Sequence, residues 1–556
     1  MWVVIMYITE VPSRRKNKTY SCVLLRESYR ESGKVKNRTI ANLSHCSREE
    51  IEAMKLALKH KSDLSQLVSL GKDVDLHEGQ SIGAVWVIFQ MARRLGVERA
   101  LGVGREGRLA LWQVMARIIE PGSRLSAVRL AQSHAACDVL GTDGFCEDDL
   151  YANLKWLEVN QTEIERRLFQ FRRAKRKPEI FLYDVTSTYL EGDHHELGYY
   201  GYNRDGKSGK KQIVVGLLCD ELGLPVSIQL FPGNTQDVST FAPQVKKAAK
   251  RFGCERVTFV GDRGMIKDPQ KQAIEKAGFH YITAITKAQI RVLIERDILQ
   301  MELFDESVCE VMCEGLRYVL RRNPQRARDI MDSRLDKKRC IETLVETKNK
   351  YLQEHKRAKI STALKNVTAK IEKLRCADWL VIRNKEGALC LDVNKKELEE
   401  ISRLDGCYVI QTDLPAPAAD AQTIHERYKD LTKVERAFRT CKTEHLDMRP
   451  VFLRKAWSTR GYAVVVMLAY VIDNALQRAW SGFDLTIPEA IGQLSTLCTM
   501  EMKVKRKGVS IHKIPQPRET TKRLLKAIGV RLPETLPKRN AKVVIKRTIV
   551  KRCEKS

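Results

Sequence analysis

The sequence predicts a multidomain α/β protein, and three observations support this fold class. The chain has 556 residues, more than one hydrophobic core usually organises, so we expect several domains. Its composition, 43% hydrophobic and 30% charged, is that of a folded globular protein. After residue 178 the apolar pattern alternates between short buried strands and amphipathic helices, which is typical of an α/β sheet.

The charge of the chain indicates a polyanionic partner. It contains 98 Lys and Arg against 69 Asp and Glu, a formal net charge of +29 at pH 7. Nucleic acid is the partner that such a balance predicts first. The 15 cysteines are scattered without a CxxC pair, which favours reduced thiols in a cytoplasmic protein over a zinc site.

The first 177 residues predict two modules ahead of the core. Residues 1–60 contain strand patterns at 19–25 and 34–43, and we expect an N-terminal β-rich basic module that lies on DNA or is a solvated hairpin. Near its end, Ser47-Arg-Glu-Glu has the pattern of a capping box that opens a helix. Residues 61–177 show helical periodicity and end in a run of basic residues, which predicts a helical DNA-binding region.

Residues 178–290 predict the first part of a core sheet. Three strand patterns follow one another, and then helices alternate with two further strands. This succession is the element order of an RNase H-like sheet. In that fold the first and fourth strands lie side by side, so Asp184 and Asp262 would meet at the sheet centre. The strand patterns lie at 179–190, 212–219, 225–231, 256–264 and 280–286.

The rest of this core comes much later in the chain. Residues 291–420 mix charged helices with strands and predict a long α+β insertion, and residues 421–485 supply the second part of the RNase H-like core. Within it, the apolar stretch 463–472 ends at Asp473, which favours a buried helix over a membrane span. Residues 486–556 are basic and punctuated by proline, so we expect a C-terminal tail.

The stretch from Tyr428 to Lys442 supplies a third acid. Tyr428, Glu435 and Lys442 recur every seventh residue, so a single helix would place all three on one face. Glu435 would then complete a group of three carboxylates with Asp184 and Asp262. Mg²⁺ prefers carboxylate oxygens, and pairs of such ions serve phosphoryl transfer on nucleic acid.

These motifs resemble the DDE-type transposases of bacterial insertion sequences. The branch in question carries Tyr, two residues, Arg, three residues, Glu, six residues and Lys, and Tyr428, Glu435 and Lys442 stand at matching positions. Leu431 stands where that branch has Arg, which is a departure from the pattern. The resemblance extends to Asp184-Val-Thr-Ser-Thr-Tyr-Leu-Glu-Gly, Phe231-Pro-Gly-Asn-Thr-Gln-Asp and Gly261-Asp-Arg-Gly-Met.

The resemblance implies a Mg²⁺-dependent enzyme, with Mn²⁺ as a substitute, that cuts DNA at transposon ends and joins the freed 3′-OH to target DNA. It implies that Asp184, Asp262 and Glu435 are catalytic and bind the metal. The implied partner is double-stranded DNA, as terminal inverted repeats and target, bound by a homodimer in the bacterial cytoplasm at the nucleoid. The residues expected to contact DNA are Tyr428, Lys442, Arg263, Lys207, Lys210, Lys211 and Trp379.

Three interpretations stay open. Trp379 either stacks on a base turned out of the DNA helix or packs within an apolar core. Gly201-Tyr-Asn-Arg-Asp-Gly206-Lys207-Ser208 matches the P-loop pattern of nucleotide hydrolases, yet a strand pattern follows where a P-loop needs a helix, which favours a basic loop near the site. A catalytically inactive DNA-binding relative is the remaining alternative, and the intact acids disfavour it.

Overall fold

The computed structural model divides into two units, each compact in itself. It describes residues 5–15, 18–31, 33–61, 74–174, 179–255, 257–355, 357–504, 509–539 and 541–545, so the basic run expected at 172–177 lies partly outside the described residues. The first unit comprises Met1–Ser81, Leu497–Pro517 and Leu532–Lys538. The second comprises Ile82–Thr496, Arg518–Arg531 and Arg539–Ser556.

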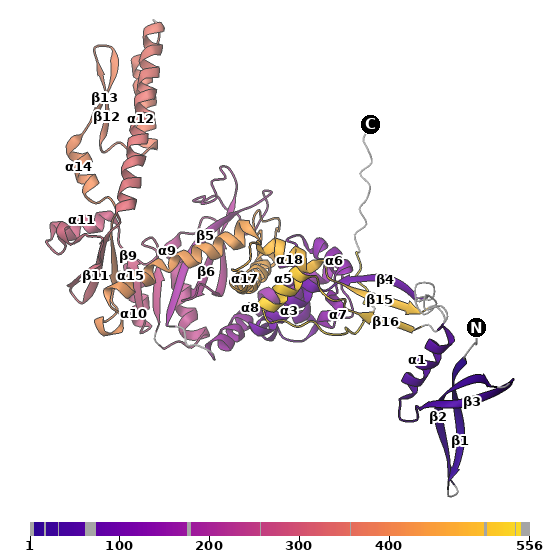
Figure 1. Ribbon diagram of the computed structural model, residues 1–556. Coiled ribbons are helices and arrows are strands. Elements are labelled where there is room, and N and C mark those ends of the chain that lie inside the picture. The colour runs from indigo at the N-terminus through magenta and orange to yellow at the C-terminus, as the bar shows by residue number, and fades with distance from the viewer. Residues whose placement is uncertain are drawn as a thin grey trace. The chain divides into compact units, whose positions relative to one another are not determined.

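The first unit contains two small antiparallel sheets (Figure 1). One sheet is formed by β1 (Ile5–Arg15), β2 (Lys18–Glu31) and β3 (Lys34–Asn42), with β2 in the centre. The expected strand patterns are β2 and β3, and β1 is an additional strand. The predicted capping box is confirmed at the start of α1 (Arg48–Lys59). There the Glu50 N–H donates to the Ser47 hydroxyl at 3.2 Å, and the Ser47 N–H donates to the Glu50 carboxylate at 2.7 Å.

The second sheet of this unit joins distant parts of the chain. β15 (Cys498–Val504) pairs antiparallel with both β4 (Val74–Ser81) and β16 (Val509–Lys513). The range expected as a C-terminal tail therefore contains regular elements. In the second unit the same range contributes α18 (Ile487–Ser495) and α19 (Glu519–Ala527), which pack on each other.

The second unit opens with a helical region. Its helices are α3 (Gly83–Arg94), α4 (Val97–Leu101), α5 (Arg105–Ile119), α6 (Arg124–Ser133), α7 (Ala136–Leu140) and α8 (Glu147–Arg173). Trp112 in the middle of α5 is fully buried, and its indole N–H donates to the Ala127 carbonyl at 3.1 Å. The apolar helix α17 (Ala456–Ala479) packs against α5 and α8 and is buried along most of its length. No helix in the described ranges is long and apolar enough to cross a membrane.

The central sheet of the second unit has the strand arrangement that the element order predicts. β5 (Ile180–Tyr189), β6 (Gln212–Asp220) and β7 (Pro225–Pro232) pair antiparallel in succession. β8 (Thr258–Gly261) lies parallel to β5 on its other side, and β9 (His280–Ala284) lies parallel to β8. The first and fourth strands are therefore neighbours, and the RNase H-like prediction is confirmed.

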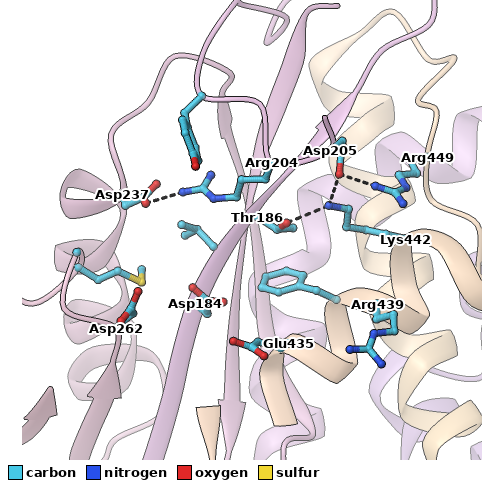
Figure 2. Close-up of a pocket in the computed structure, with 15 residues that line it drawn as sticks. Asp184, Thr186, Arg204, Asp205, Asp237, Asp262, Glu435, Arg439, Lys442 and Arg449 are labelled. Atoms are coloured by element: carbon cyan, nitrogen blue, oxygen red, sulfur yellow. Dashed lines mark hydrogen bonds and ion pairs between the residues drawn. The ribbon is translucent and has the colours of Figure 1, made fainter. Parts of the chain in front are cut away.

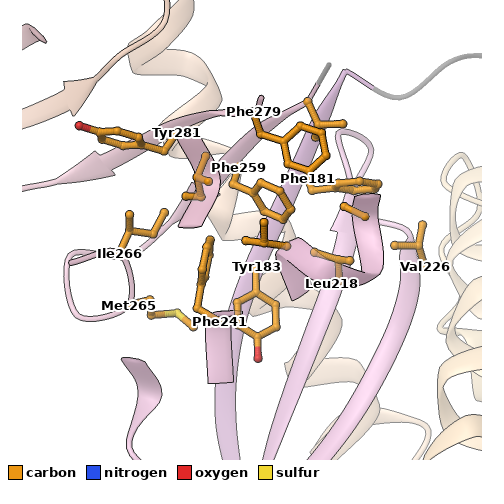
Figure 3. Close-up of a cluster of buried hydrophobic side chains, with 14 of the residues drawn as sticks. Phe181, Tyr183, Leu218, Val226, Phe241, Phe259, Met265, Ile266, Phe279 and Tyr281 are labelled. Carbon is orange, nitrogen blue, oxygen red and sulfur yellow. The ribbon is translucent and has the colours of Figure 1, made fainter. Parts of the chain in front are cut away.

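An aromatic core on one face of this sheet orients the residues of β5 (Figure 3). Phe181 and Phe259 pack across β5 and β8 with ring centroids 5.8 Å apart and their planes tilted by 45°. Phe241 of α9 (Asp237–Lys246) packs edge-on against Phe259 at 5.5 Å and against Tyr183 at 5.7 Å. Side chains alternate along a strand, so Phe181 and Tyr183 point into this core while Asp184 points to the opposite face.

The insertion after β9 first extends the sheet and then builds a core of its own. β10 (Cys309–Cys313), β11 (Leu316–Arg322) and β14 (Cys407–Thr412) continue the sheet beyond β9, so part of the range expected as an insertion belongs to the core sheet. Trp379 packs in the separate hydrophobic core with residues such as Ile341 and Val367. Helix α10 (Asp268–Lys276) precedes β9. The insertion also contains α11 (Lys287–Glu295), α12 (Pro324–Glu354), α13 (Ile360–Lys373), β12 (Leu380–Lys385), β13 (Ala388–Val393) and α14 (Lys395–Arg403).

Candidate active site

The single helix expected from 428 to 442 is wrong in detail, because the stretch consists of three consecutive helical segments. They are α15 (Ala421–Lys429), α16 (Leu431–Arg439) and a π-helical turn, η5 (Thr440–Glu444). Asp430 lies between the first two segments, and its ψ of −14° differs from the roughly −42° of an α-helix. The regular helical hydrogen-bond pattern is interrupted at this residue. The wider turn of η5 carries Lys442, and π-turns are common at functional sites.

The three acids come together around one pocket of about 540 Å³ (Figure 2). Asp184 lies in β5, Asp262 directly follows β8, and Glu435 lies on α16. Because Tyr183 pairs with Gly261 in the parallel register, Asp184 within β5 lies beside the point where Asp262 follows the end of β8. Thr186 projects from the same face of β5 as Asp184, and its hydroxyl accepts a hydrogen bond from Lys442 at 3.0 Å. This contact places η5 over the face that carries Asp184.

The acids repel one another electrostatically. Burial, followed by the negative charges of Asp262 and Glu435, raises the pKa of Asp184 to about 7. Tyr428 donates a hydrogen bond from its hydroxyl to Asp262 Oδ1 at 3.3 Å. Burial, and then the charge of Asp262, raise the pKa of Tyr428, so the phenol stays protonated and able to donate.

A buried ion-pair cluster forms the other side of the pocket. Asp205 Oδ1 accepts hydrogen bonds from Lys442 Nζ at 2.6 Å and from Arg449 Nη1 at 2.5 Å. The Asp205 side chain is 1% exposed and that of Lys442 is 11% exposed. Burial lowers the pKa of Lys442, while the Asp205 carboxylate opposes this shift.

Within the described chain, ion pairing separates the five carboxylates of the pocket into two groups. Asp205 is paired as above, and Asp237 Oδ2 accepts a hydrogen bond from Arg204 Nη2 at 2.5 Å. Asp184, Asp262 and Glu435 have no ion pair among the residues that the structure describes, and Figure 2 shows them apart from the dashed contacts. The three acids that the sequence predicts are thus the pocket carboxylates without an ion pair in the described part of the chain.

The donor set fits a hard divalent cation. Carboxylate oxygens are the ligands that Mg²⁺ prefers, and Mg²⁺ keeps several waters, so it does not need a closed cage of side chains. Among the described residues, no three His, Cys, Asp or Glu side chains are close enough together to hold a metal ion as they stand. Burial and the neighbouring carboxylates disfavour the charged form of Asp184 and raise its pKa, and a bound cation would oppose both effects.

Several residues expected to contact DNA lie outside the pocket. Arg263 is exposed beside Asp262. Lys210 pairs with Glu191 at 3.0 Å, and Lys211 donates to the Asp193 carbonyl at 2.9 Å. Trp379 is 5% exposed and belongs to the core of the insertion, which agrees with the packing interpretation. Lys207 is exposed on the loop between β5 and β6.

The P-loop-like stretch lacks the structure that phosphate binding by this motif requires. It leads into strand β6, so the helix that a P-loop needs directly after the glycine-rich loop is replaced by a strand. Instead the stretch supplies Arg204 and Asp205 to the pocket. Sequence reasoning missed the role of Asp205, because a charged residue in a glycine-rich loop gives no sign that it is buried.

The position that departs from the family pattern is not part of the pocket. Leu431 is half-buried at the start of α16 and does not line it. Three arginines from elsewhere in the chain line the pocket, namely Arg204, Arg439 and Arg449. The guanidinium groups near the acids therefore come from positions that the family pattern does not specify, and a motif search does not find them.

An RNase H-like sheet that brings two strand acids and one helix acid into a single pocket defines a DDE-type nucleic-acid enzyme. A family model described as "Transposase DDE domain" matches residues 175–472, which is more than half of the chain. A second, described as "IS1634 family transposase, N-terminal domain", matches residues 8–68. The chain therefore belongs to the DDE transposase family, and its function is that of a transposase.

One solved structure similar to this chain is the cryo-EM structure of the piggyBac transposase synaptic complex with hairpin DNA. The two chains are 10% identical, the match covers 74% of this chain and 75% of that chain, and the TM-score is 0.35. Among curated proteins, no sequence matches this chain.

Proposed function

We propose that this transposase cuts DNA strands at the ends of its own insertion sequence by metal-dependent hydrolysis and joins the freed 3′-OH to target DNA. One observation carries the proposal. Of the five carboxylates around the pocket, the cations of the described chain neutralise Asp205 and Asp237 and leave Asp184, Asp262 and Glu435. Three carboxylates without ion pairs in the described chain, beside several cationic side chains, suit a site that handles metal ions and a phosphodiester together.

Asp184, Asp262 and Glu435 would hold Mg²⁺, with Mn²⁺ as a substitute. When bound, divalent ions activate the attacking oxygen and stabilise the leaving oxygen of an in-line displacement at phosphorus. The Tyr428 hydroxyl holds the Asp262 carboxylate in position through its hydrogen bond at 3.3 Å. Its raised pKa keeps the proton on the phenol throughout the neutral range.

Lys442, Arg439 and Arg449 are the proposed phosphate contacts inside the pocket. Each lines it, and two of them are fixed in place by Asp205. Arg263 and the lysines of the loop between β5 and β6 are proposed to contact the DNA backbone further from the acids. Trp379 is not among the proposed contacts, because it is buried in the core of the insertion.

The proposed partners are the terminal inverted repeats of the element and the target DNA, both double-stranded. The net charge of +29 provides the electrostatic attraction for such a polyanion. Cutting two ends of one element favours a homodimer assembled on DNA. A cytoplasmic location at the nucleoid belongs to the same proposal, because that is where the bacterial DNA lies.

Incubation of the protein with the end sequences of its element tests the proposal. Strand cleavage in Mg²⁺ or Mn²⁺, absent with EDTA and independent of ATP, is the expected result. Binding to the ends without cleavage in either metal would overturn the proposal and favour an inactive DNA-binding relative. A strict requirement for ATP would instead point to the P-loop-like stretch.

A further inference from the structure

We infer that the loop between β5 and β6 carries a binding platform for unpaired bases of single-stranded DNA next to the active-site acids. The inference rests on the proposed action on DNA ends. Tyr199, Tyr200 and Tyr202 are 47%, 64% and 80% exposed. Tyr202 also lines the pocket that contains the acids, so the row of tyrosines begins at the candidate active site.

The backbone that carries these tyrosines is firmly attached to the sheet at one end. The buried Gln212 side chain donates from Nε2 to the Tyr202 carbonyl at 3.0 Å and to the Gly233 carbonyl at 2.9 Å. The backbones of Tyr199 and Gln212 exchange two hydrogen bonds, at 3.0 and 3.2 Å. A Cβ at Gly201 would lie 2.2 Å from the Gly233 oxygen, so glycine lets the loop lie directly on this strand end.

The loop is fixed at its other end as well. The Arg204 N–H donates to the hydroxyl of buried Ser187 at 3.1 Å, and Asp205 is held by Lys442 and Arg449. The tyrosines are thus exposed on a backbone that buried groups hold in place. Rigid aromatic side chains lose little conformational entropy on binding, which suits them to contact a ligand.

Cations alternate with the aromatic rings along this loop. Arg204 Cζ lies 5.6 Å from the ring centroid of Tyr202, and Lys211 Nζ lies 5.9 Å from that of Tyr200. Lys207 Nζ lies 5.9 Å from the ring centroid of Tyr189 at the end of β5. Proteins that bind single-stranded nucleic acid use this combination, because rings stack on bases while cations contact the backbone.

Unpaired bases are the occupant that this chemistry selects. In a double helix the base faces are stacked on each other and are not accessible to the tyrosine rings. Binding of a duplex would therefore need only the cations, which contact its phosphates. An unpaired strand offers both base faces and phosphates. A platform that begins at the acids would hold the bases next to the phosphodiester that is cut or joined.

The test compares two fluorescent probes by anisotropy in EDTA, so that no cleavage occurs. One is a short thymidine homo-oligonucleotide, and the other is an abasic oligomer of the same length and charge. The wild-type chain should bind the thymidine oligomer about tenfold more tightly, since stacking contributes about 1–3 kcal/mol per base. The Tyr200→Ala/Tyr202→Ala double variant should lose this preference while its affinity for the abasic oligomer stays unchanged.

Two controls make the result specific to the platform. The Tyr200→Phe/Tyr202→Phe double variant keeps both rings and should keep the preference. Tyr351→Ala removes a tyrosine on α12 that is also 51% exposed, and it should have no effect. A preference that survives in the double alanine variant, or a loss of affinity equal for both probes, would overturn the inference. A base preference in a protein that cuts no DNA would overturn the proposed function alone.

Discussion

Asp205 and Lys442 are 237 positions apart in sequence, yet the carboxylate of the first accepts a hydrogen bond from the ammonium of the second at 2.6 Å. Asp205 lies on the loop after β5, and Lys442 lies on η5, beyond the whole insertion. Arg449 binds the same carboxylate oxygen. The contact therefore ties the two parts of the RNase H-like core together at the pocket and fixes two cations beside the acids.

Removing the Asp205 carboxylate should lower both stability and strand cleavage. In Asp205→Ala, Lys442 and Arg449 lose their shared partner in a buried position, and we expect a loss of about 3 kcal/mol in the free energy of unfolding. Asp205→Asn keeps an acceptor oxygen and should lose less. Glu191→Ala breaks the exposed ion pair with Lys210 and serves as a control, with an expected change under about 0.5 kcal/mol. Equal effects of Asp205→Ala and Glu191→Ala in chemical denaturation would contradict the account.

Metal affinity should increase with pH through the neutral range. Asp184 has a pKa raised to about 7 in the protein without metal, so below that pH a cation must displace its proton. Mn²⁺ affinity, measured by calorimetry without DNA, should increase up to about tenfold per pH unit below 7 and level off above it. Asp184→Asn should bind more weakly and lose this pH dependence. A pH-independent affinity in the unaltered protein would contradict the electrostatic account of the site.

Truncation of Trp379 should affect stability before it affects DNA chemistry. The side chain is 5% exposed in the core of the insertion, so Trp379→Ala leaves a cavity that costs about 3–5 kcal/mol. Trp379→Phe should cost less. Thermal unfolding measures the loss, and cleavage assays below the transition temperature should show activity close to that of the unaltered chain. Full stability of Trp379→Ala together with lost cleavage would favour the base-stacking interpretation.

Binding of duplex DNA should weaken steeply with salt, and Arg449 should contribute to that dependence. If its guanidinium contacts a phosphate, Arg449→Ala reduces the slope of log affinity against log salt by about 1. Lys350→Ala, which removes an exposed cation of α12, provides the control and should leave the slope unchanged. A slope unaltered by Arg449→Ala would exclude this residue from the phosphate contacts.

The strand order and the three acids could be predicted from the sequence because they follow from local patterns. β5 and β8 are short apolar runs that each carry or precede one acid, and Glu435 belongs to a seven-residue repeat. Tertiary features could not be predicted in the same way. The burial of Asp205 depends on Lys442 and Arg449, which no local pattern connects to it.

The sheet extension by β14 and the helix break at Asp430 could not be predicted from the sequence for the same reason. β14 pairs with β9 across the whole insertion, a contact that chain periodicity does not encode. Asp430 interrupts the helix between α15 and α16 within a sequence whose apolar spacing continues without a gap. Local preference is a weak guide wherever tertiary contacts decide the backbone.

Strand cleavage of the element's ends by single variants of the five pocket carboxylates tests the central claim most directly. Asp184→Asn, Asp262→Asn and Glu435→Gln should each bind the ends and cut nothing, because each would lose a proposed metal ligand. Asp237→Asn, whose carboxylate is already paired with Arg204, should keep cleavage within about tenfold of the unaltered chain. Cleavage that survives in any of the first three variants would contradict the assignment of the site.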